Sequence, residues 1–382
     1  MISRTGRGLL SEWWWTVDRP AVLIMLALFG IGLLLAVAAS PAVSGGPHSG
    51  GNFYYAVKQV AFAGSAVALL IGVSLLPPAK IGPVALAVFV LALLGTIAAR
   101  MFGAEIFGAR RWLDFAGITI QPSEFLKPGF AVLTAVVLSV TALPENVRRT
   151  ATLFLLVPVL GALISQPDIG QTFLILALWA SMMFFAGLSL KWFWLIGGGT
   201  AGLGVLLYTV VRYVHRRIDL FLDAKTGTYQ AGLSLKAFAH GGFAGVGAGA
   251  GTVKYRLPFA HSDYIFSVAG EEFGFLLCIA IVALFCALAV RVMLRSASSR
   301  DPFVQLAGAG LAVSVALQAF INMGVAVNLL PAKGMTLPFV SYGGSSLFAV
   351  ALTMGFALAL TRQRPKFAGS EPPFAFMQGA RP

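Results

Sequence analysis

Long unbroken runs of apolar residues, separated by short polar stretches, fill most of this chain. A helix that crosses a bilayer needs about 20 such residues. The runs lack the period-two alternation of outer-membrane barrel strands. The pattern therefore predicts an all-α, polytopic integral membrane protein with about ten spans, at roughly 21–39, 56–76, 82–99, 124–142, 150–165, 170–188, 191–211, 265–290, 303–328 and 338–360.

Composition agrees with this class. Of the 382 residues, 58% are hydrophobic and 11% are charged, against roughly 25% charged residues in soluble domains. The net charge of +13 is spread over loops between the spans. An anionic membrane surface is thus the expected partner, rather than nucleic acid. Cys278 and Cys286 share one apolar run, which predicts neither a disulfide framework nor a metal site.

Arginine and lysine in the short loops predict the orientation, because such charges concentrate on the cytoplasmic side. An even number of spans then places both termini inside. A cleaved signal peptide is the competing interpretation, suggested by early arginines and by Ala36-Val37-Ala38. It is disfavoured because the apolar run of about 19 residues is too long for a signal peptide.

The domain organisation follows from these spans. Residues 1–20 are expected to form a cytoplasmic or interfacial N-terminus, 21–362 the membrane domain and 363–382 a disordered cytoplasmic tail. Two longer segments, about 100–123 and 212–264, are expected outside the membrane. Long loops in compact domains are usually functional or disordered, and the aromatic, glycine and charged residues here favour function.

The outside segments are basic, against the charge rule. Long loops are partly exempt from that rule. Alternatively, an outward-facing basic concavity binds an anionic group, and the planar fork of arginine suits phosphate. Composition leaves both interpretations open.

Two further stretches carry distinctive polar or glycine patterns. Glu124 and Lys127 are three residues apart, so they share a helix face and can pair. They form either an ion pair at the membrane edge or part of a cavity lining. The stretch GGFAGVGAGAGT at 241–252 lacks both GK[ST] and GxGxxG, so it is no phosphate loop. A flexible or tightly packed loop is expected instead.

The last outside loop, 330–346, mixes prolines, glycines and hydroxyl residues, including Ser341. Irregular backbone at membrane depth is tolerated where it is buried in protein or lines a cavity. The loop is therefore either a simple turn or a substrate lining.

Three carboxylates stand close together in AHSDYIFSVAGEEFGFLL: Asp263, Glu271 and Glu272. The glutamates are expected to pair with basic loop residues or with Lys127. Asp263 lies in a loop beside His261 and apolar residues, and such surroundings raise the proton affinity of a carboxylate. Asp263 is thus a candidate general base for a hydroxyl, or an anchor for a cation carrying a pyrophosphate.

Taken together, these residues resemble the SEDS family (shape, elongation, division, sporulation) along about residues 20–362. The resemblance is carried by GARRWLDFAGITIQPSEFLK, QPDIGQT, YQAGLSLKAFAHGG, LPFAHSDYIFSVAGEEFG and NLLPAKGMTLPFVSYGGSS. ARRW and the Lys-Gly-x-Thr step are closer to division members than to elongation members. Phe259 stands where the family often has glutamate, and Pro128 follows Lys127, which predicts an early kink.

The resemblance implies a peptidoglycan glycosyltransferase in the bacterial inner membrane, acting at the division septum. Its substrate would be lipid II, a disaccharide pentapeptide on undecaprenyl pyrophosphate. Its partners would be a class B penicillin-binding protein and other division proteins. Asp263 matches the catalytic aspartate, and a divalent cation (Mg²⁺ or Mn²⁺) on Asp263 is compatible with that role.

The same resemblance assigns Glu124 and Lys127 to a central cavity, with Ser341 as a further lining residue. His261, Glu271 and Glu272 are expected to support the site. Beyond the resemblance, we hypothesise that a cluster of basic residues holds the pyrophosphate: Arg110, Arg111, Lys254, Arg256 and Lys333.

Two other functions are compatible with the same sequence. A lipid II flippase would also need intramembrane charges and a basic cavity. A non-catalytic scaffold would recruit the transpeptidase and tolerate Asp263→Ala. The position of Asp263 after a long outside loop favours the polymerase.

Overall fold

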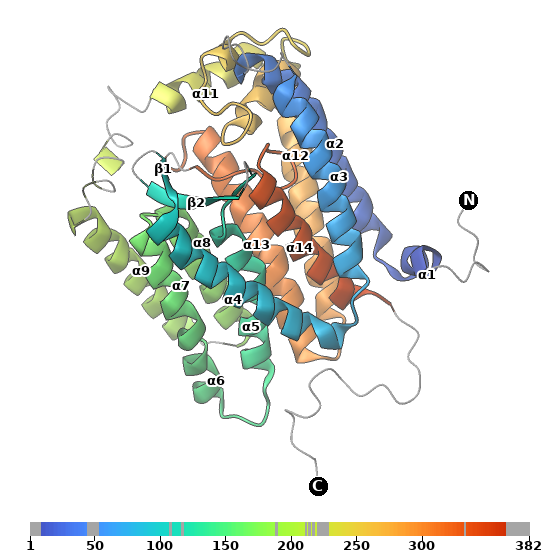
Figure 1. Cartoon of the computed structure of the whole chain (residues 1–382), viewed down its shortest axis with the longest axis vertical. Helices are drawn as coiled ribbons and strands as arrows, with labels where there is room; N and C mark the ends of the chain where they lie inside the picture. The colour runs from blue at the N-terminus through green and yellow to red at the C-terminus, as the bar shows by residue number, and fades with distance from the viewer. Residues whose placement is uncertain are drawn as a thin grey trace.

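The computed structural model describes residues 9–43, 53–106, 109–115, 118–187, 190–210, 212, 215, 218–219, 229–331 and 334–363. The tail at 364–382 and Lys333 lie outside these residues. Helices dominate the described part (Figure 1). The elements are α1 (Leu9–Thr16), α2 (Arg19–Val43), α3 (Tyr54–Ser74), α4 (Pro78–Phe102), β1 (Ala104–Ile106), β2 (Ala109–Phe115), β3 (Ile118–Ile120), α5 (Ser123–Ser139), α6 (Glu145–Ala151), α7 (Leu153–Ser165), α8 (Ile169–Phe185), α9 (Leu190–Val210), α11 (Tyr229–Gly241), η1 (Val253–Tyr255), α12 (Ile265–Ala297), α13 (Pro302–Ala326) and α14 (Gly344–Thr361).

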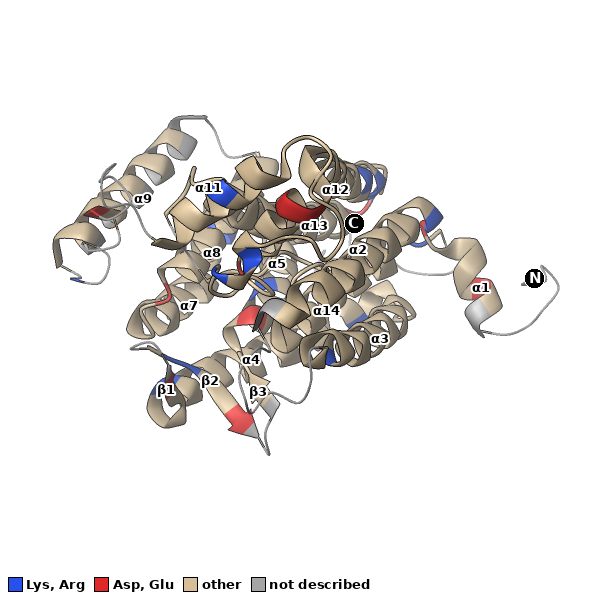
Figure 2. Cartoon of the chain, turned by 90° about the horizontal axis from the view of Figure 1, so that it is seen from above, with Lys and Arg blue, Asp and Glu red and all other residues tan. Residues whose placement is uncertain are grey.

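The apolar runs form the helices of a membrane bundle. Within the described residues, seven helical segments are long and apolar enough to cross a bilayer, and α8 and residues 197–210 form shorter apolar helices. The polytopic helical class is therefore confirmed, while the count of ten spans stays a prediction. Seen from the end that carries α11, charged residues are sparse along the helices (Figure 2).

Helix α14 is the buried centre of the bundle. It packs on α3, α13 and α5, whereas α12 packs on α13, α11 and α2. In α14, 78% of the most apolar 18-residue stretch is buried, against 28% for α12. A helix that is apolar all round is stable in such a central place because neighbouring helices cover every face.

The two ends of the described chain meet at one end of the bundle (Figure 1). The backbone N–H of Gln363 donates to the carbonyl of Thr16 at 3.0 Å. The Arg362 guanidinium also donates to the Thr16 hydroxyl, at 3.0 Å. The first and last described segments thus lie on one side of the bundle; the cytoplasmic location of the termini stays a prediction.

One expected boundary is corrected. The last span was expected from about 338, but α14 begins at Gly344, because residues 338–341 form a turn. The run at 150–165 lies within one candidate span, Glu145–Ser165, in which α6 and α7 meet at Thr152.

Both long segments have structure that the apolar pattern did not predict. Residues 104–120 form a three-stranded antiparallel sheet in the order β1-β2-β3, with Glu105 opposite Arg110 and Leu113 opposite Ile120. The sheet packs on α4. Within 212–264, α11 and η1 flank the glycine-rich stretch and lie at the same end of the bundle as the sheet (Figure 1).

Candidate active site

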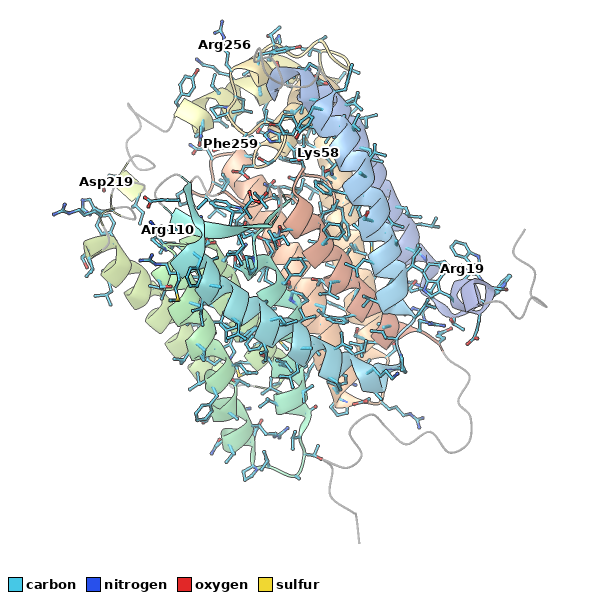
Figure 3. The ribbon with its side chains drawn as sticks, in the orientation of Figure 1. Arg19, Lys58, Arg110, Asp219, Arg256 and Phe259 are labelled. Atoms are coloured by element: carbon cyan, nitrogen blue, oxygen red, sulfur yellow. The ribbon has the colours of Figure 1, made fainter. Side chains whose placement is uncertain are left out.

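Asp263 lies in the turn that leads into α12. The turn begins at Phe259, whose φ is +57° and whose carbonyl accepts from the N–H groups of Ser262 and Tyr264 (3.1 and 3.2 Å). Residues other than glycine rarely adopt a positive φ outside such turns. Phe259, Arg256 and Lys58 are all labelled in the part of the molecule that carries α11 (Figure 3).

Three consecutive carbonyl groups of this turn are held by the C-terminal part of the chain. The carbonyl of His261 accepts from the Tyr342 N–H at 2.9 Å. That of Ser262 accepts from the Ser341 hydroxyl at 2.6 Å, and that of Asp263 accepts from the Asn322 amide at 2.9 Å. We call these three bonds the carbonyl clamp. Each bond fixes the backbone of one of three consecutive residues. The clamp therefore fixes the backbone position from which the Asp263 side chain projects.

The clamp brings the last loop against the Asp263 carboxylate. A Cβ atom on Gly334 would lie 3.2 Å from Asp263 Oδ2. Asn322 also donates to the carbonyl of Met335 at 2.6 Å, and Ser341 accepts from the Leu337 N–H at 2.8 Å. The Ser341 hydroxyl is therefore engaged on both sides within the protein; its role in lining a substrate site stays a prediction.

Past this turn, α12 is broken at Gly274, whose φ of 74° and ψ of −172° are not helical. The glycine-rich stretch 241–252 fills the break. A Cβ on Gly274 would lie 2.4 Å from the Gly245 nitrogen. The backbones approach so closely that only glycine fits there.

Hydrogen bonds between the two backbones replace those that α12 loses. The N–H groups of Val246 and Gly247 donate to the carbonyls of Glu271 and Glu272, both at 3.0 Å. Such replacement is needed because an unpaired backbone group costs free energy in an apolar environment. The packed-loop interpretation of 241–252 thus describes the structure.

The Glu271 and Glu272 side chains fasten the residues that follow the glycines. Glu271 accepts from the N–H groups of Thr252, Val253 and Lys254 at 2.7, 2.7 and 2.9 Å. Lys254 forms a buried ion pair with Glu272. Both glutamates therefore hold the segment leading to Asp263.

Lys254 does not fit the pyrophosphate role expected for it. Its side chain is 1% exposed, and its ammonium donates to the Ala38 carbonyl at 2.7 Å as well as to Glu272. Releasing a buried lysine from its partner carboxylate is strongly unfavourable. The sequence suggested a phosphate ligand because it shows the charge but not the burial.

Arg111 is likewise engaged within the protein. Its guanidinium donates to the carbonyls of Gln166 (3.2 Å) and Pro167 (2.6 Å) and lies 3.8 Å from Asp168. Arg110 is 3.5 Å from Glu105, and its side chain is 43% exposed. Arg256 is exposed at the α11 end of the molecule (Figure 3). Arg110 and Arg256 are thus the more accessible of the four described candidates.

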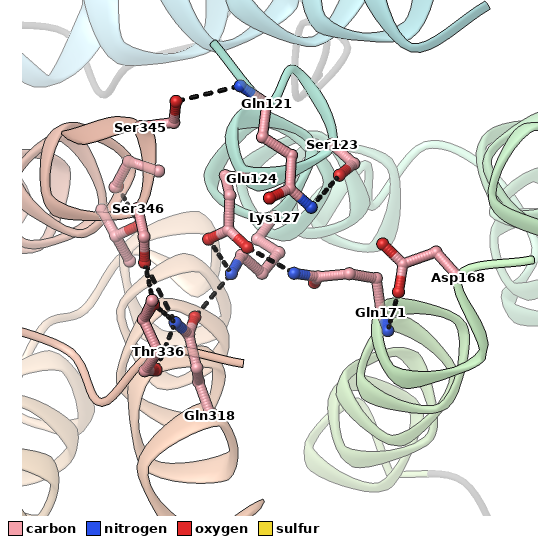
Figure 4. Close-up of polar contacts among 12 residues, drawn as sticks. Gln121, Ser123, Glu124, Lys127, Asp168, Gln171, Gln318, Thr336, Ser345 and Ser346 are labelled. Carbon is pink, nitrogen blue, oxygen red and sulfur yellow. Dashed lines mark hydrogen bonds and ion pairs between the residues drawn. The ribbon is translucent and has the colours of Figure 1, made fainter. Parts of the chain in front are cut away.

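Glu124 and Lys127 belong to a polar network buried between α5, α8 and α13 (Figure 4). The Lys127 ammonium lies 2.6 Å from Glu124 and donates to Gln318 at 2.5 Å. Glu124 also accepts from the Gln171 amide at 2.5 Å. The ion pair is confirmed by these distances; a role in lining a substrate cavity stays a prediction.

The network reaches the last loop through Gln318. Its amide donates to the carbonyl of Thr336 (3.0 Å) and to the Ser346 hydroxyl (3.3 Å). Thr336 follows Met335 and Gly334, which lie at the carbonyl clamp. The central network and the Asp263 turn are therefore connected through a short stretch of loop.

His261 lies in an aromatic environment. Its ring centroid is 4.5 Å from that of Tyr55 and 5.5 Å from that of Tyr342. Burial lowers the pKa of His261 from 6.5 to about 4, so the ring is neutral near pH 7. Within the described residues, its buried Nδ1 atom has no hydrogen-bond partner.

Sequence reasoning missed Gln171, Gln318, Asn322 and Lys58. Gln318 and Asn322 lie four residues apart inside an apolar run, hence on one helix face. Polar residues within a span usually face the bundle interior, so this spacing was a usable signal. Lys58 gave no signal because a lysine at a span end is ordinary.

The described residues do not form a protein-only metal site, since they contain no group of three or more His, Cys, Asp or Glu side chains. Asp263 supplies one carboxylate. Mg²⁺ is commonly held by one or two carboxylates together with substrate phosphates, so a cation here would depend on the substrate for further ligands.

The fold defines the chain as a polytopic α-helical membrane protein. A family profile described as "Cell cycle protein" (FtsW/RodA/SpoVE) matches residues 19–366. The chain belongs to this family, and the resemblance predicted from its motifs is confirmed.

Two curated relatives carry the name probable peptidoglycan glycosyltransferase FtsW. The Caulobacter vibrioides protein is 39% identical, over 98% of this chain and 96% of its own length. The Trichlorobacter lovleyi protein is 34% identical, over 90% and 93%.

Solved structures share the fold. Thermus thermophilus RodA matches with a TM-score of 0.68 and 25% identity, over 91% of this chain and 97% of that one. A chain from a peptidoglycan synthase complex, described as coordinating polymerization and crosslinking, matches with a TM-score of 0.73 and 24% identity, over 90% and 97%.

Proposed function

We propose that this protein is a peptidoglycan glycosyltransferase that polymerises lipid II on the outer face of the cytoplasmic membrane, for septal wall synthesis. The observation that carries the proposal is the fixed position of Asp263, at the end of the bundle opposite the contact between Thr16 and Gln363. The names of the relatives support the same activity.

In the proposed reaction, a sugar hydroxyl of one lipid II attacks the anomeric carbon of another, and the undecaprenyl pyrophosphate leaves. Asp263 accepts the hydroxyl proton as general base. The pyrophosphate leaves as an anion, which nearby cations stabilise. Arg110, Arg256 and Lys333 remain candidates for that task, whereas Lys254 and Arg111 are engaged elsewhere.

The carbonyl clamp supplies the positioning that such a base requires. A general base must come within about 3 Å of the proton that it removes, and misplacement by 1 Å costs about 100-fold in rate. The clamp acts on backbone carbonyls, so it positions Asp263 without using the carboxylate as a hydrogen-bonding group.

A class B penicillin-binding protein is the proposed partner, because one structural neighbour comes from a peptidoglycan synthase complex. The inner membrane and the division septum are the proposed locations. Other division proteins of the membrane are expected nearby.

The direct test is glycan formation from purified lipid II in liposomes, with the cognate transpeptidase and Mg²⁺ or Mn²⁺ present or absent. Asp263→Asn keeps the size and the backbone bonds but removes the base. We expect a loss of about 10³-fold. Asp301→Asn is the matched control, because Asp301 caps α13 and Asn caps helices equally well.

Equal polymer from wild type and Asp263→Asn would contradict the proposal. Absence of polymer from wild type, even with the partner and cation, would do the same. Either result would favour a flippase or a scaffold.

A further inference from the structure

Three aromatic rings from distant parts of the sequence converge beside Asp263. Tyr55 comes from α3, His261 from the turn before α12, and Tyr342 from the loop before α14. The Tyr55 centroid lies 4.5 Å from His261 and 5.1 Å from Tyr342. The Tyr342 N–H bond to the His261 carbonyl locks two of the three segments together.

Packing alone does not explain these residue types. All three side chains are half-buried, so they retain access to solvent or ligand. Within the described residues, the buried Nδ1 of His261 lacks a hydrogen-bond partner. Leaving a polar atom unpaired costs about 1–3 kcal/mol. Nδ1 itself is closed to a ligand, whereas Nε2, the other ring nitrogen of this half-buried side chain, is not among the buried unpaired atoms and can meet a hydroxyl or amide group of a ligand.

A lysine stands next to the rings on the same helix as Tyr55. Lys58 is three residues after Tyr55 and four after Tyr54, so all three share one face of α3. Its ammonium lies 4.5 Å from the Tyr54 ring centroid. In the described part of the chain, no carboxylate pairs with Lys58. Lys58 therefore keeps its charge available for an anion, unlike Lys254 and Lys127.

Sugar rings combine apolar C–H faces with hydroxyl edges. Binding sites for small polar ligands are commonly lined by aromatic side chains with a few placed polar groups, and tyrosine offers both an apolar face and a hydroxyl. The rings, the His261 nitrogen and the Lys58 ammonium together match a saccharide joined to an anionic group.

We propose that Tyr55, His261 and Tyr342 form a saccharide-binding subsite beside Asp263, with Lys58 contacting the pyrophosphate of the same lipid-linked sugar. This inference rests on the proposed function, because it places one of the two lipid II molecules. His261 binds a hydroxyl or amide of the sugar, while the tyrosine rings contact its apolar face. Asp263, two residues beyond His261, then faces the reacting end.

The test uses full-length protein carrying Asp263→Asn, so that binding is measured without turnover. Two probes are compared in detergent: lipid II, and undecaprenyl pyrophosphate, which lacks the sugars. We expect Tyr55→Leu to weaken lipid II binding about 10-fold, equivalent to losing roughly 1.4 kcal/mol. Its binding of undecaprenyl pyrophosphate should be unchanged. Tyr55→Phe, which keeps the ring, should bind lipid II within about threefold of the parent.

Lys58→Met should weaken both probes about equally, because both carry the pyrophosphate. Tyr229→Leu is the matched control, since Tyr229 is 67% exposed on α11 and touches none of the three rings. Equal lipid II affinity for the parent and Tyr55→Leu would overturn the subsite. The subsite would also be overturned if Tyr55→Leu lost the same affinity for lipid II and for undecaprenyl pyrophosphate.

The two proposals fail separately. If otherwise wild-type protein polymerises lipid II and Tyr55→Leu leaves KM unchanged, the subsite is wrong and the polymerase stands. If no polymer forms but the Asp263→Asn binding data depend on the Tyr55 ring as expected, the subsite stands and the polymerase assignment is wrong.

Discussion

Two buried lysine–glutamate pairs, Lys254–Glu272 and Lys127–Glu124, look alike locally but have different surroundings. The side chains of the first are 1% and 0% exposed, and those of the second 3% and 6%. Both lysines donate to a further acceptor besides the carboxylate. In sequence, each pair is one lysine and one glutamate within or beside an apolar run.

The difference lies in where the hydrogen bonds lead. The Lys254 ammonium donates to the Ala38 carbonyl of α2, and Glu272 also accepts from the Gly249 N–H at 3.1 Å. That cluster fastens a loop to two helices. Lys127 instead leads through Gln318 to Thr336, in the loop that touches Asp263. One pair thus builds the scaffold, and the other is connected to the proposed chemistry.

The largest expected effect comes from breaking the scaffold pair. Lys254→Met leaves Glu272 buried without its counter-charge, which costs about 3–5 kcal/mol. Thermal unfolding in detergent should show a strongly lowered midpoint. Lys254→Met/Glu272→Gln removes both charges and should recover most of that loss. A single variant as stable as wild type would show that the pair is not structural.

Gly245→Ala should destabilise the same region. The new Cβ would lie 2.2 Å from the Glu272 carbonyl oxygen, at a φ of +83°. Backbone strain and overpacking together cost about 3 kcal/mol. Gly249→Ala is the control, since its φ is +81° but its Cβ would meet no atom within 4 Å. It should cost only about 1 kcal/mol. If both variants lost the same stability, backbone strain rather than contact with α12 would account for the destabilisation.

Acidification should weaken the Asp263 turn through His261. Its pKa is lowered to about 4 in the folded protein, so the unfolded chain binds this proton first. The contribution of His261 to stability is full above about pH 6.5 and falls as the pH drops toward 4, by no more than about 1.4 kcal/mol per pH unit. His261→Gln, which cannot titrate, should flatten that part of the stability profile. An unchanged slope would contradict the assignment.

The smallest effect is expected from Ser341→Ala. It removes the Ser341 bonds to Ser262 and Leu337, a loss of about 1–2 kcal/mol. The turn then holds Asp263 less firmly, so kcat should fall several-fold with KM nearly unchanged. Ser341→Thr, which restores the hydroxyl, should recover part of the rate. A rise in KM alone would instead favour the original substrate-lining interpretation.

The sequence predicts the membrane class and the helices well, because long apolar runs have few alternatives to a buried helix. It does not predict the sheet at 104–120, whose short strands are stabilised by packing on α4. Glu271, Glu272 and Asp263 were recognisable as unusual carboxylates. The burial of Lys254 could not be recognised, because the sequence around a lysine in a loop does not indicate which helix will pack over it.

The carbonyl clamp lay beyond sequence reasoning for a related reason. Its donors are a backbone N–H, a serine and an asparagine, which are common residues and groups. They become informative only when folding brings 322 and 341–342 against 261–263. Long-range backbone contacts of this kind leave no periodic pattern in the sequence.

The most direct measurement compares polymerisation of lipid II, per folded molecule, in two matched double variants. Lys254→Met/Glu272→Gln removes the scaffold pair, and Lys127→Met/Glu124→Gln removes the pair linked to Asp263. The first should retain activity within about threefold of wild type, while the second should fall about 100-fold, as expected for a displaced catalytic group. Equal losses in both, or the larger loss in the Lys254 variant, would contradict the division into scaffold and catalytic network.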